Sequence, residues 1–430
     1  MRLIASLLSE GSDQRLEHNV GTERVRVSAT AGADDVPRRP ATSADADAAS
    51  WSWATRVGLT VWVGTRVGFL VVAGIITAIA RPRVPVGGPW YAWPFRVYAR
   101  DDAGYFRNIA NLGYLNRGVH SVDVAFFPGY PLAGRYLAYG LGVGHITVID
   151  YQAALALIAW AGAAVAAILL CKHVAEAAGP GPGTASVVLL LAGPYSLFFM
   201  TSYSEGPFLA FALGAWMCAR RQAWAWAGVL CGFATLVRIN GMFLFAGIVV
   251  MFVLDARTTH RPRPRLSPLS LLLPVLALGG YFAWLRGATG HWDAWFTAQR
   301  VGWERYTTWP WRTLTNSIEL LRRVTQPARR LQSALEILFA ALLLAALTVL
   351  GRRRMWPELT YVGLSALALL TSSFYQDVPR STILAFPVLA FVAQWSMASP
   401  HRRVVWTIVA ASSVLLVTNV AFFVRGYTAG

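Results

Sequence analysis

Apolar runs of about 20 residues, each long enough for an α-helix to cross a bilayer, alternate with polar segments along most of the chain. The pattern predicts an all-α, polytopic membrane protein with about eleven transmembrane helices. The Gly-rich apolar segment 132–147 is interpreted as either a further span or a re-entrant piece. The expected spans are 57–80, 149–171, 184–201, 205–219, 223–237, 240–254, 267–287, 332–351, 356–373, 381–398 and 404–424.

The first 52 residues do not follow this pattern. They are rich in Ala, Asp, Arg and Ser and lack sustained periodicity, which predicts a disordered cytoplasmic tail over residues 1–52. The apolar run that opens the chain is too short for a convincing signal peptide. Asp45 and Asp47 form a D-x-D pattern, but it lies in this tail with no fold around it, so we expect no metal site there.

The distribution of basic residues favours one orientation in the membrane. With the N-terminus inside, nearly all basic clusters fall in internal loops, as the positive-inside rule requires, and an extra span at 132–147 would break that agreement. The loops 81–148 and 288–331 are then external, on the outer face of the cell membrane. The internal basic residues are Lys172, Arg220, Arg221, Arg261, Arg263, Arg265, Arg352, Arg353, Arg354, Arg402 and Arg403.

The composition excludes an ordinary soluble domain, because 56% of the residues are hydrophobic and only 14% are charged. The formal net charge of +17 indicates anionic lipid head groups rather than nucleic acid as the partner, since the arginines cluster between spans. Cys171, Cys218 and Cys231 lie in or beside apolar runs at spacings that indicate neither a zinc site nor a disulfide framework.

The longest polar interval between spans runs from Tyr98 to Pro131. In it, Asp101 and Asp102 precede a short amphipathic segment with apolar residues at helical spacing from Tyr105 onward, which predicts interfacial helices in this first external loop. A carboxylate near an apolar boundary has a raised proton affinity and can act as a general base. The alternative is a pair of solvated loop carboxylates.

Other charged residues are expected at the external ends of the spans. Glu205 lies in a tight turn, where a carboxylate near lipid must find water or a partner; it is otherwise a simple charge at a hairpin tip. Arg238, followed closely by Asn240, is a candidate to bind phosphate through its guanidinium fork, or else extends to lipid head groups. Arg380 follows in a third external turn. Arg66, inside the first span, is interpreted as extending inward to the interface rather than as catalytic.

The outer loop from His291 to Trp311 contains five tryptophans with arginines and carboxylates between them. Gln299, Trp303 and Arg305 lie in this loop. Interleaved aromatic and charged side chains form either a surface on which sugars stack or an anchor at the membrane interface.

These segments, taken together and in order, resemble the PIG-V-like mannosyltransferases of the GT-C glycosyltransferase superfamily, in their bacterial branch. The resemblance covers about residues 55–400. Asp101 stands where the family has Trp, so we align Asp102 with the family's aspartate. Ser381 stands where the family has Tyr, directly after Arg380, and changes the surroundings of that arginine. The matching segments are DDAGYFRNIANLGY, AFFPGYP, GPYSLFFMTSYSEGPFL, LVRING, AQRVGWERYTTWPW and VPRSTILAFPVLA.

The resemblance implies that residues 53–430 form a GT-C-like transmembrane glycosyltransferase domain. It implies transfer of a sugar, usually mannose, from a polyprenyl-phosphate donor to a lipid- or glycan-linked acceptor on the outer face of the membrane, with inversion. We expect this scheme to require no cofactor and no divalent metal. Asp102 would be the base, with Asp101 and Glu205 as alternatives, and Arg238, Asn240 and Arg380 would bind the donor phosphate. The residues that would contact the sugars are Tyr105, Arg107, Phe127, Tyr130, Gln299, Trp303 and Arg305.

A transporter or flippase for lipids or glycolipids is the main alternative. It would place its functional charges near the middle of the spans. The candidate charges of this chain gather at the external ends instead, which favours an enzyme. A structural membrane partner gives no reason for Asp102, Glu205, Arg238 and Arg380 to share one side.

Overall fold

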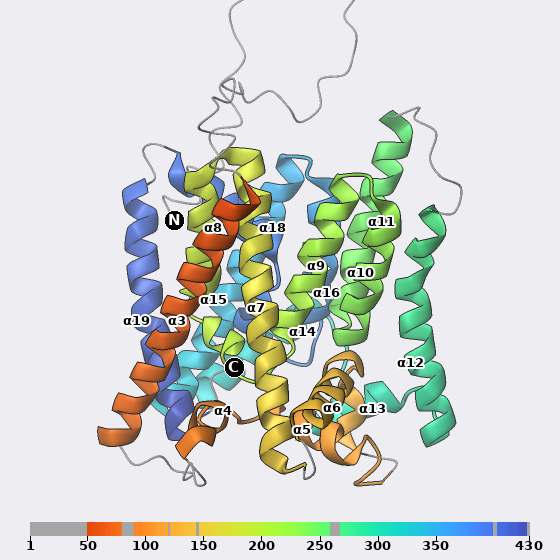
Figure 1. Cartoon of the computed structure of the whole chain (residues 1–430), viewed down its shortest axis with the longest axis vertical. Coiled ribbons are helices and arrows are strands. Elements are labelled where there is room, and N and C mark those ends of the chain that lie inside the picture. Colours follow the sequence, from red (N-terminus) through yellow and green to blue (C-terminus); the bar gives the residue numbers. More distant parts are fainter. Residues whose placement is uncertain are drawn as a thin grey trace, which may run out of the picture.

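The computed structural model describes residues 50–79, 90–118, 121–142, 146–258, 267–398 and 402–427. The described residues form helices and no β-strand, so the expected all-α class is confirmed. Figure 1 shows long helices running side by side along the vertical axis, with α4, α5, α6 and α13 gathered at the lower end. The helices are α3 (Trp51–Ile79), α4 (Trp93–Arg96), α5 (Asp102–Leu112), α6 (Gly129–Leu141), α7 (Val148–Ala178), α8 (Pro180–Leu191), α9 (Glu205–Arg220), α10 (Trp224–Val237), α11 (Asn240–Thr258), α12 (Leu273–Thr289), α13 (Ala294–Trp303), α14 (Pro310–Arg323), α15 (Pro327–Arg352), α16 (Trp356–Leu370), α17 (Val378–Thr382), α18 (Phe386–Met397) and α19 (Arg402–Arg425), with 3-10 turns η1 (Trp90–Ala92), η2 (Val122–Ala125), η3 (Ser196–Phe199) and η4 (Ser267–Leu272).

The chain is a multi-pass membrane protein by the length and apolarity of its helices. Three shorter apolar helices, α8, α10 and α18, lie among the six long ones, and the count of about eleven spans stays a prediction. The expected tail, with Asp45 and Asp47, and the arginines at 261, 263 and 265 lie outside the described residues. The six long apolar segments are Trp51–Ile79, Val148–Ala178, Asn240–Arg257, Leu269–Thr289, Pro327–Arg352 and Trp406–Arg425.

One expected span is corrected, and one alternative left open by the sequence is decided. The expected span 184–201 is not one continuous helix: α8 ends at Leu191, just before Gly193 and Pro194, and a separate 3-10 turn, η3, follows. Pro194 disfavours helical backbone at the residue before it, which accounts for the break. Segment 132–147 is not a further span, because α6 has only 13 residues, or about 20 Å of helix, whereas the apolar core of a bilayer measures about 30 Å.

Arg66 also differs from its interpretation. Its side chain is buried in the bundle, and Nη1 donates a hydrogen bond of 2.6 Å to the carbonyl oxygen of Phe199 in η3. Its guanidinium lies over the rings of Trp62 and Phe69. Arg66 therefore ties α3 to the irregular segment that follows α8, and it does not extend to the interface.

The close approach of α7 and α9 fixes where α9 begins. Gly162 of α7 and Gly206 of α9 face each other, and a Cβ added at Gly162 would lie 2.4 Å from the backbone nitrogen of Pro207. A side chain at either glycine would force the two helices apart. Since Glu205 directly precedes Gly206, this contact also fixes the depth at which the Glu205 carboxylate lies.

Candidate active site

The charged residues expected at the external ends of the spans meet at one point. Asp102 is the first residue of α5, and it is held there because Phe106, Ile109 and Ala110 on the same helix are buried. Its Oδ2 accepts a hydrogen bond of 2.6 Å from Nη1 of Arg380. The residue before it, Asp101, has a φ of 51°, a strained value for a non-glycine residue.

Glu205 is the buried centre of this cluster. Its side chain is fully buried at the start of α9, and its Oε1 accepts hydrogen bonds from Arg380 Nε at 2.6 Å and from Arg238 Nη1 at 3.0 Å. Arg238 stands in extended backbone between α10 and α11, and it also donates to the hydroxyl of Ser204 at 2.8 Å. One carboxylate oxygen of Glu205 thus accepts hydrogen bonds from the guanidinium groups of two arginines that lie far apart in the sequence.

Arg380 joins the two carboxylates. It is almost fully buried in α17, and its guanidinium lies over the ring of Tyr203, 4.4 Å from the ring centroid, and over that of Phe198 at 4.8 Å. Burial on its own would lower the pKa of this guanidinium, but the charges of Glu205 and Asp102 outweigh it and raise that pKa well above its usual range. Arg380 therefore stays charged at every physiological pH.

A second set of contacts holds the segment that carries Arg380. Arg305 pairs with Asp377 at 2.6 Å and also donates to the side chain of Gln376. Glu336 of α15 accepts hydrogen bonds from the backbone nitrogens of Asp377 at 3.0 Å and Val378 at 2.9 Å. Asp377 itself has a left-handed φ of 60°, so the start of α17 is a bent segment held by Glu336.

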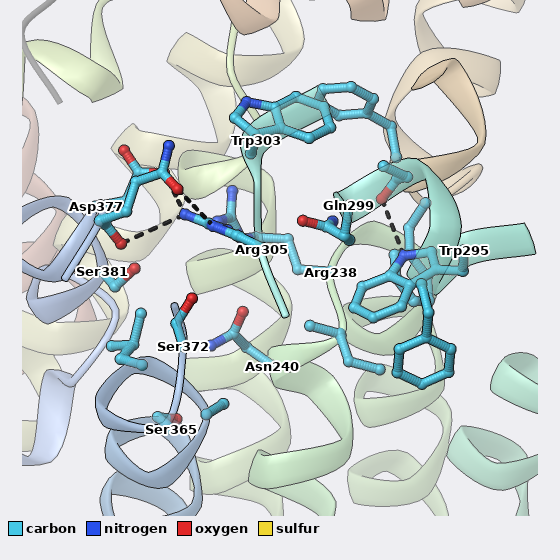
Figure 2. Close-up of a pocket in the computed structure, with 18 of the residues that line it drawn as sticks. Arg238, Asn240, Trp295, Gln299, Trp303, Arg305, Ser365, Ser372, Asp377 and Ser381 are labelled. Carbon is cyan, nitrogen blue, oxygen red and sulfur yellow. Dashed lines mark hydrogen bonds and ion pairs between the residues drawn. The ribbon is translucent and has the colours of Figure 1, made fainter. Parts of the chain in front are cut away.

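Two cavities open on either side of this cluster. The first has a volume of about 830 Å³ and is drawn in Figure 2; the second has a volume of about 790 Å³. Both are lined by Asp102 and Arg380, so this ion pair lies where the cavities adjoin. The other residues that line both are Trp303, Gln376 and Asp377.

The first cavity has a polar end and an apolar wall. Figure 2 shows Arg238, Arg305, Gln299 and Asn240 around its interior, with Trp295 at one side. Apolar side chains from the membrane helices α11 and α16 form part of the lining. They include Phe243, Ala368 and Leu369.

Aromatic rings separate the cavities. Tyr105 packs against Phe126 and Trp303, with ring centroids 5.2 Å and 5.7 Å away. Trp309 and Trp311 stack on each other and are exposed, outside both linings.

Most residues predicted from the sequence line one of the cavities. Arg238, Asn240, Phe127, Gln299 and Arg305 line the first, Asp101, Tyr105 and Arg107 line the second, and Asp102, Trp303 and Arg380 line both.

Two predicted residues lie elsewhere. Glu205 is buried behind the cavities, and its place indicates that it holds the arginines rather than contacts a substrate. Tyr130 is buried against Phe106 and donates a hydrogen bond to the carbonyl oxygen of Leu155, so it packs the core and the sugar contact expected for it finds no support.

Two residues of the cluster were missed by sequence reasoning. Glu336 lies in an apolar run, and nothing in the local sequence distinguishes Tyr203 from the other aromatic residues around it. The one signal for Glu336 is a carboxylate within an expected span. Among the described residues, no group of three or more His, Cys, Asp or Glu side chains is arranged to hold a metal ion.

Partial desolvation, and then the neighbouring charge of Asp102, raise the pKa of the Asp101 carboxyl, although this side chain is exposed. The two adjacent aspartates differ in position: Asp102 accepts a hydrogen bond from Arg380 and lines both cavities, whereas Asp101 lines only the second. The placement of Asp102 between the cavities, rather than a pKa, distinguishes it as the candidate base.

No family model matches the chain, and no curated protein matches it. The solved structures that resemble it include the oligosaccharyltransferase of Archaeoglobus fulgidus in its apo form, with a TM-score of 0.41 at 13% identity over 87% of this chain and 56% of that one. The same enzyme tethered to an acceptor peptide gives a TM-score of 0.38 at 14% identity over 84% of this chain and 55% of that one.

A third resembling structure is the archaeal oligosaccharyltransferase AglB, also from Archaeoglobus fulgidus, in complex with an inhibitory peptide and a dolichol-phosphate. It gives a TM-score of 0.40 at 13% identity over 86% of this chain and 56% of that one. The present chain thus spans little more than half the length of these structures. The likeness is too weak to carry an argument about function.

The role of Glu336 can be tested with Glu336→Gln. A glutamine offers one acceptor oxygen where the carboxylate offers two, and its amide group would face a backbone N–H. We expect a loss of about 1–3 kcal/mol in the free energy of unfolding. The matched control is Glu319→Gln on α14, an exposed residue paired with Arg323, which should change that free energy by less than about 0.5 kcal/mol. Denaturation of both purified variants in detergent measures the difference, and equal stabilities would refute the role.

Proposed function

We propose that this protein is a membrane glycosyltransferase of the GT-C type that moves a sugar from a polyprenyl-phosphate donor to a lipid- or glycan-linked acceptor with inversion. The observation that carries the proposal is the position of Asp102. Its carboxylate, paired with Arg380, stands where two separate cavities adjoin. A transfer between two bound substrates requires a reactive group at such a junction.

The first cavity suits the donor. Part of its apolar wall belongs to the membrane helices α11 and α16, which gives a polyprenyl chain a way in from the membrane, and the guanidinium of Arg238 lies at its polar end. A guanidinium can bind a phosphate by two parallel hydrogen bonds. Arg238 is already oriented by Ser204 and Glu205, which leaves its second terminal nitrogen available to the phosphate. Asn240, at the start of α11, is placed to assist.

The second cavity suits the acceptor, and the chemistry follows from that placement. Asp102 takes the proton of the acceptor hydroxyl, and the oxygen attacks the anomeric carbon of the donor sugar from the opposite side to the phosphate. The bond between that carbon and the phosphate oxygen breaks, and the polyprenyl phosphate leaves with the electron pair. Arg238 and Arg380 stabilise the negative charge that develops on it. This scheme uses no cofactor and no divalent metal.

The particular sugar rests on the family resemblance alone, which indicates mannose and the PIG-V-like branch. The pocket residues are compatible with any hexose: Gln299 and Arg305 offer hydrogen bonds, and Trp303 offers a face for stacking. A lipid transporter would instead carry its charges along the middle of the spans. The cluster of Asp102, Glu205, Arg238 and Arg380 at the ends of α5, α9 and α10 favours the enzyme.

We place the cavities on the outer face of the cell membrane, with the N-terminus in the cytoplasm. Support comes from Lys172, Arg220, Arg221 and Arg352 to Arg354, which lie at the helix ends opposite the cavities. With the three native cysteines replaced, Arg312→Cys should react with an impermeant thiol reagent in intact cells, and Arg353→Cys only after permeabilisation. Labelling of the second site in intact cells would reverse the orientation.

One assay tests both the proposed function and the proposed base. The purified protein is mixed with radiolabelled polyprenyl-phosphate mannose and a membrane lipid extract, and the transfer of label to lipid is measured. Wild-type protein should produce a labelled product. Asp102→Asn should remain monodisperse and lower the initial rate at saturating donor by about 10²–10⁴-fold, because a positioned base is lost. Asp101→Asn, the matched control, should lower it far less.

Each outcome of this assay contradicts a different part of the proposal. If Asp101→Asn were inactive and Asp102→Asn active, Asp101 would be the base. Full activity of both variants would show that neither aspartate is the base. Lipid movement without any labelled product would favour the transporter.

A further inference from the structure

The segment from Pro310 to Arg330 carries more positive charge than its place in the chain requires. It contains five arginines and a single carboxylate, Glu319, and it lies at the cavity end of the bundle, since Leu320 and Val324 line the second cavity. In the orientation proposed above this end is the outer one, where the positive-inside rule gives no reason for an excess of arginine. The excess therefore calls for a binding partner.

Four of these arginines are exposed and line neither cavity, and we call them the α14 basic surface. Arg323 pairs with Glu319, whereas the other three form no ion pair with any residue that the structure describes. The surface therefore keeps most of its positive charge. It consists of Arg312, Arg322 and Arg323 of α14 and Arg330 of α15.

An apolar flank runs along α14 beside these arginines. Trp311, Leu314, Ile318 and Leu321 follow one another at spacings of three, four and three residues, which places them on one side of the helix. All four side chains are at least partly exposed, although they are apolar. A helix that carries basic residues beside an exposed apolar flank is typical of one that lies in the interface of a membrane.

The buried face of α14 is fixed to the bundle. Thr313 donates a hydrogen bond of 2.5 Å to the carbonyl oxygen of Ser372, and the hydroxyl of Ser317 accepts one of 2.8 Å from the backbone nitrogen of Tyr375. The helix also packs against α15, which follows it in the chain and is long and apolar enough to cross a bilayer. These contacts hold the α14 basic surface close to the end of a membrane span.

We propose that the α14 basic surface binds the anionic head groups of phospholipids in the membrane leaflet at the cavity end. The guanidinium groups bind the lipid phosphates, because their planar fork matches a phosphate. Trp311 and Leu314 enter the boundary between head groups and acyl chains. The inference depends neither on the proposed sugar transfer nor on which leaflet the cavity end faces.

Quenching of a fluorophore on α14 tests this proposal without relying on catalysis. The full-length protein, with its three native cysteines replaced, is labelled at Thr315→Cys, an exposed position between Arg312 and Arg322. In phosphatidylcholine nanodiscs, a small share of phosphatidylglycerol or of phosphatidylcholine carries a nitroxide quencher near the top of one acyl chain.

We expect phosphatidylglycerol to be enriched over phosphatidylcholine at the fluorophore by about 5-fold, which is the contribution of one arginine near a charged membrane surface. The enrichment should shrink as the salt concentration rises, because the arginines are exposed.

The triple variant Arg312→Gln, Arg322→Gln and Arg330→Gln should be quenched equally by both lipids. Lysine at the same three positions should keep most of the preference, because the charge remains. The matched control is Arg425→Gln, an exposed arginine at the end of α19 that lines neither cavity. It should keep the full preference of the parent protein.

Three results would overturn the proposal. Equal quenching of the parent protein by the two lipids would leave the α14 basic surface to water or to a protein partner. A preference that persists in the triple glutamine variant, or that falls as much in Arg425→Gln, would place the lipid elsewhere or assign it to net charge alone. Because the measurement involves no sugar transfer, its failure is distinguishable from a failure of the proposed function.

Discussion

The buried ion pair between Glu205 and Arg380 is the constraint on which the site depends. A fully buried carboxylate is costly unless it is paired, and Glu205 is paired twice, by Arg380 and by Arg238. These three residues come from the start of α9, from α17 and from the turn between α10 and α11. The pairing therefore joins three segments far apart in the sequence at one depth in the bundle.

The same pairing orients the groups that face the cavities. Because Arg380 is fixed by Glu205 on one side and by the rings of Phe198 and Tyr203, its outer nitrogen is directed to Asp102. Glu336 adds a second restraint by holding the backbone just before Arg380. A base and a phosphate-binding cation prepared in this way need little rearrangement when substrates bind.

The sequence allowed the helical class and most of the site to be predicted, and physical reasons explain what it missed. Length and apolarity identify a membrane helix from local sequence alone. Charged residues at the ends of the expected spans fall on one side of the membrane, so Asp102, Arg238 and Arg380 could be proposed as site residues.

The missed features depend on tertiary contacts. Nothing local distinguishes a buried Glu205 from one at a hairpin tip, and Glu336 matters only because residues 377 and 378 lie against it. Tyr130 was misjudged because an aromatic residue near a proline turn fits a core position as well as a binding surface.

The most direct measurement is a double-mutant cycle on Glu205→Gln and Arg380→Gln, followed by the free energy of unfolding in detergent. If the pair is the central constraint, each single variant should lose about 3–5 kcal/mol, because it takes one of two partners from a buried charge, and the double variant should lose no more than the worse single one. Losses that simply add, or single variants within about 0.5 kcal/mol of wild-type protein, would contradict the account.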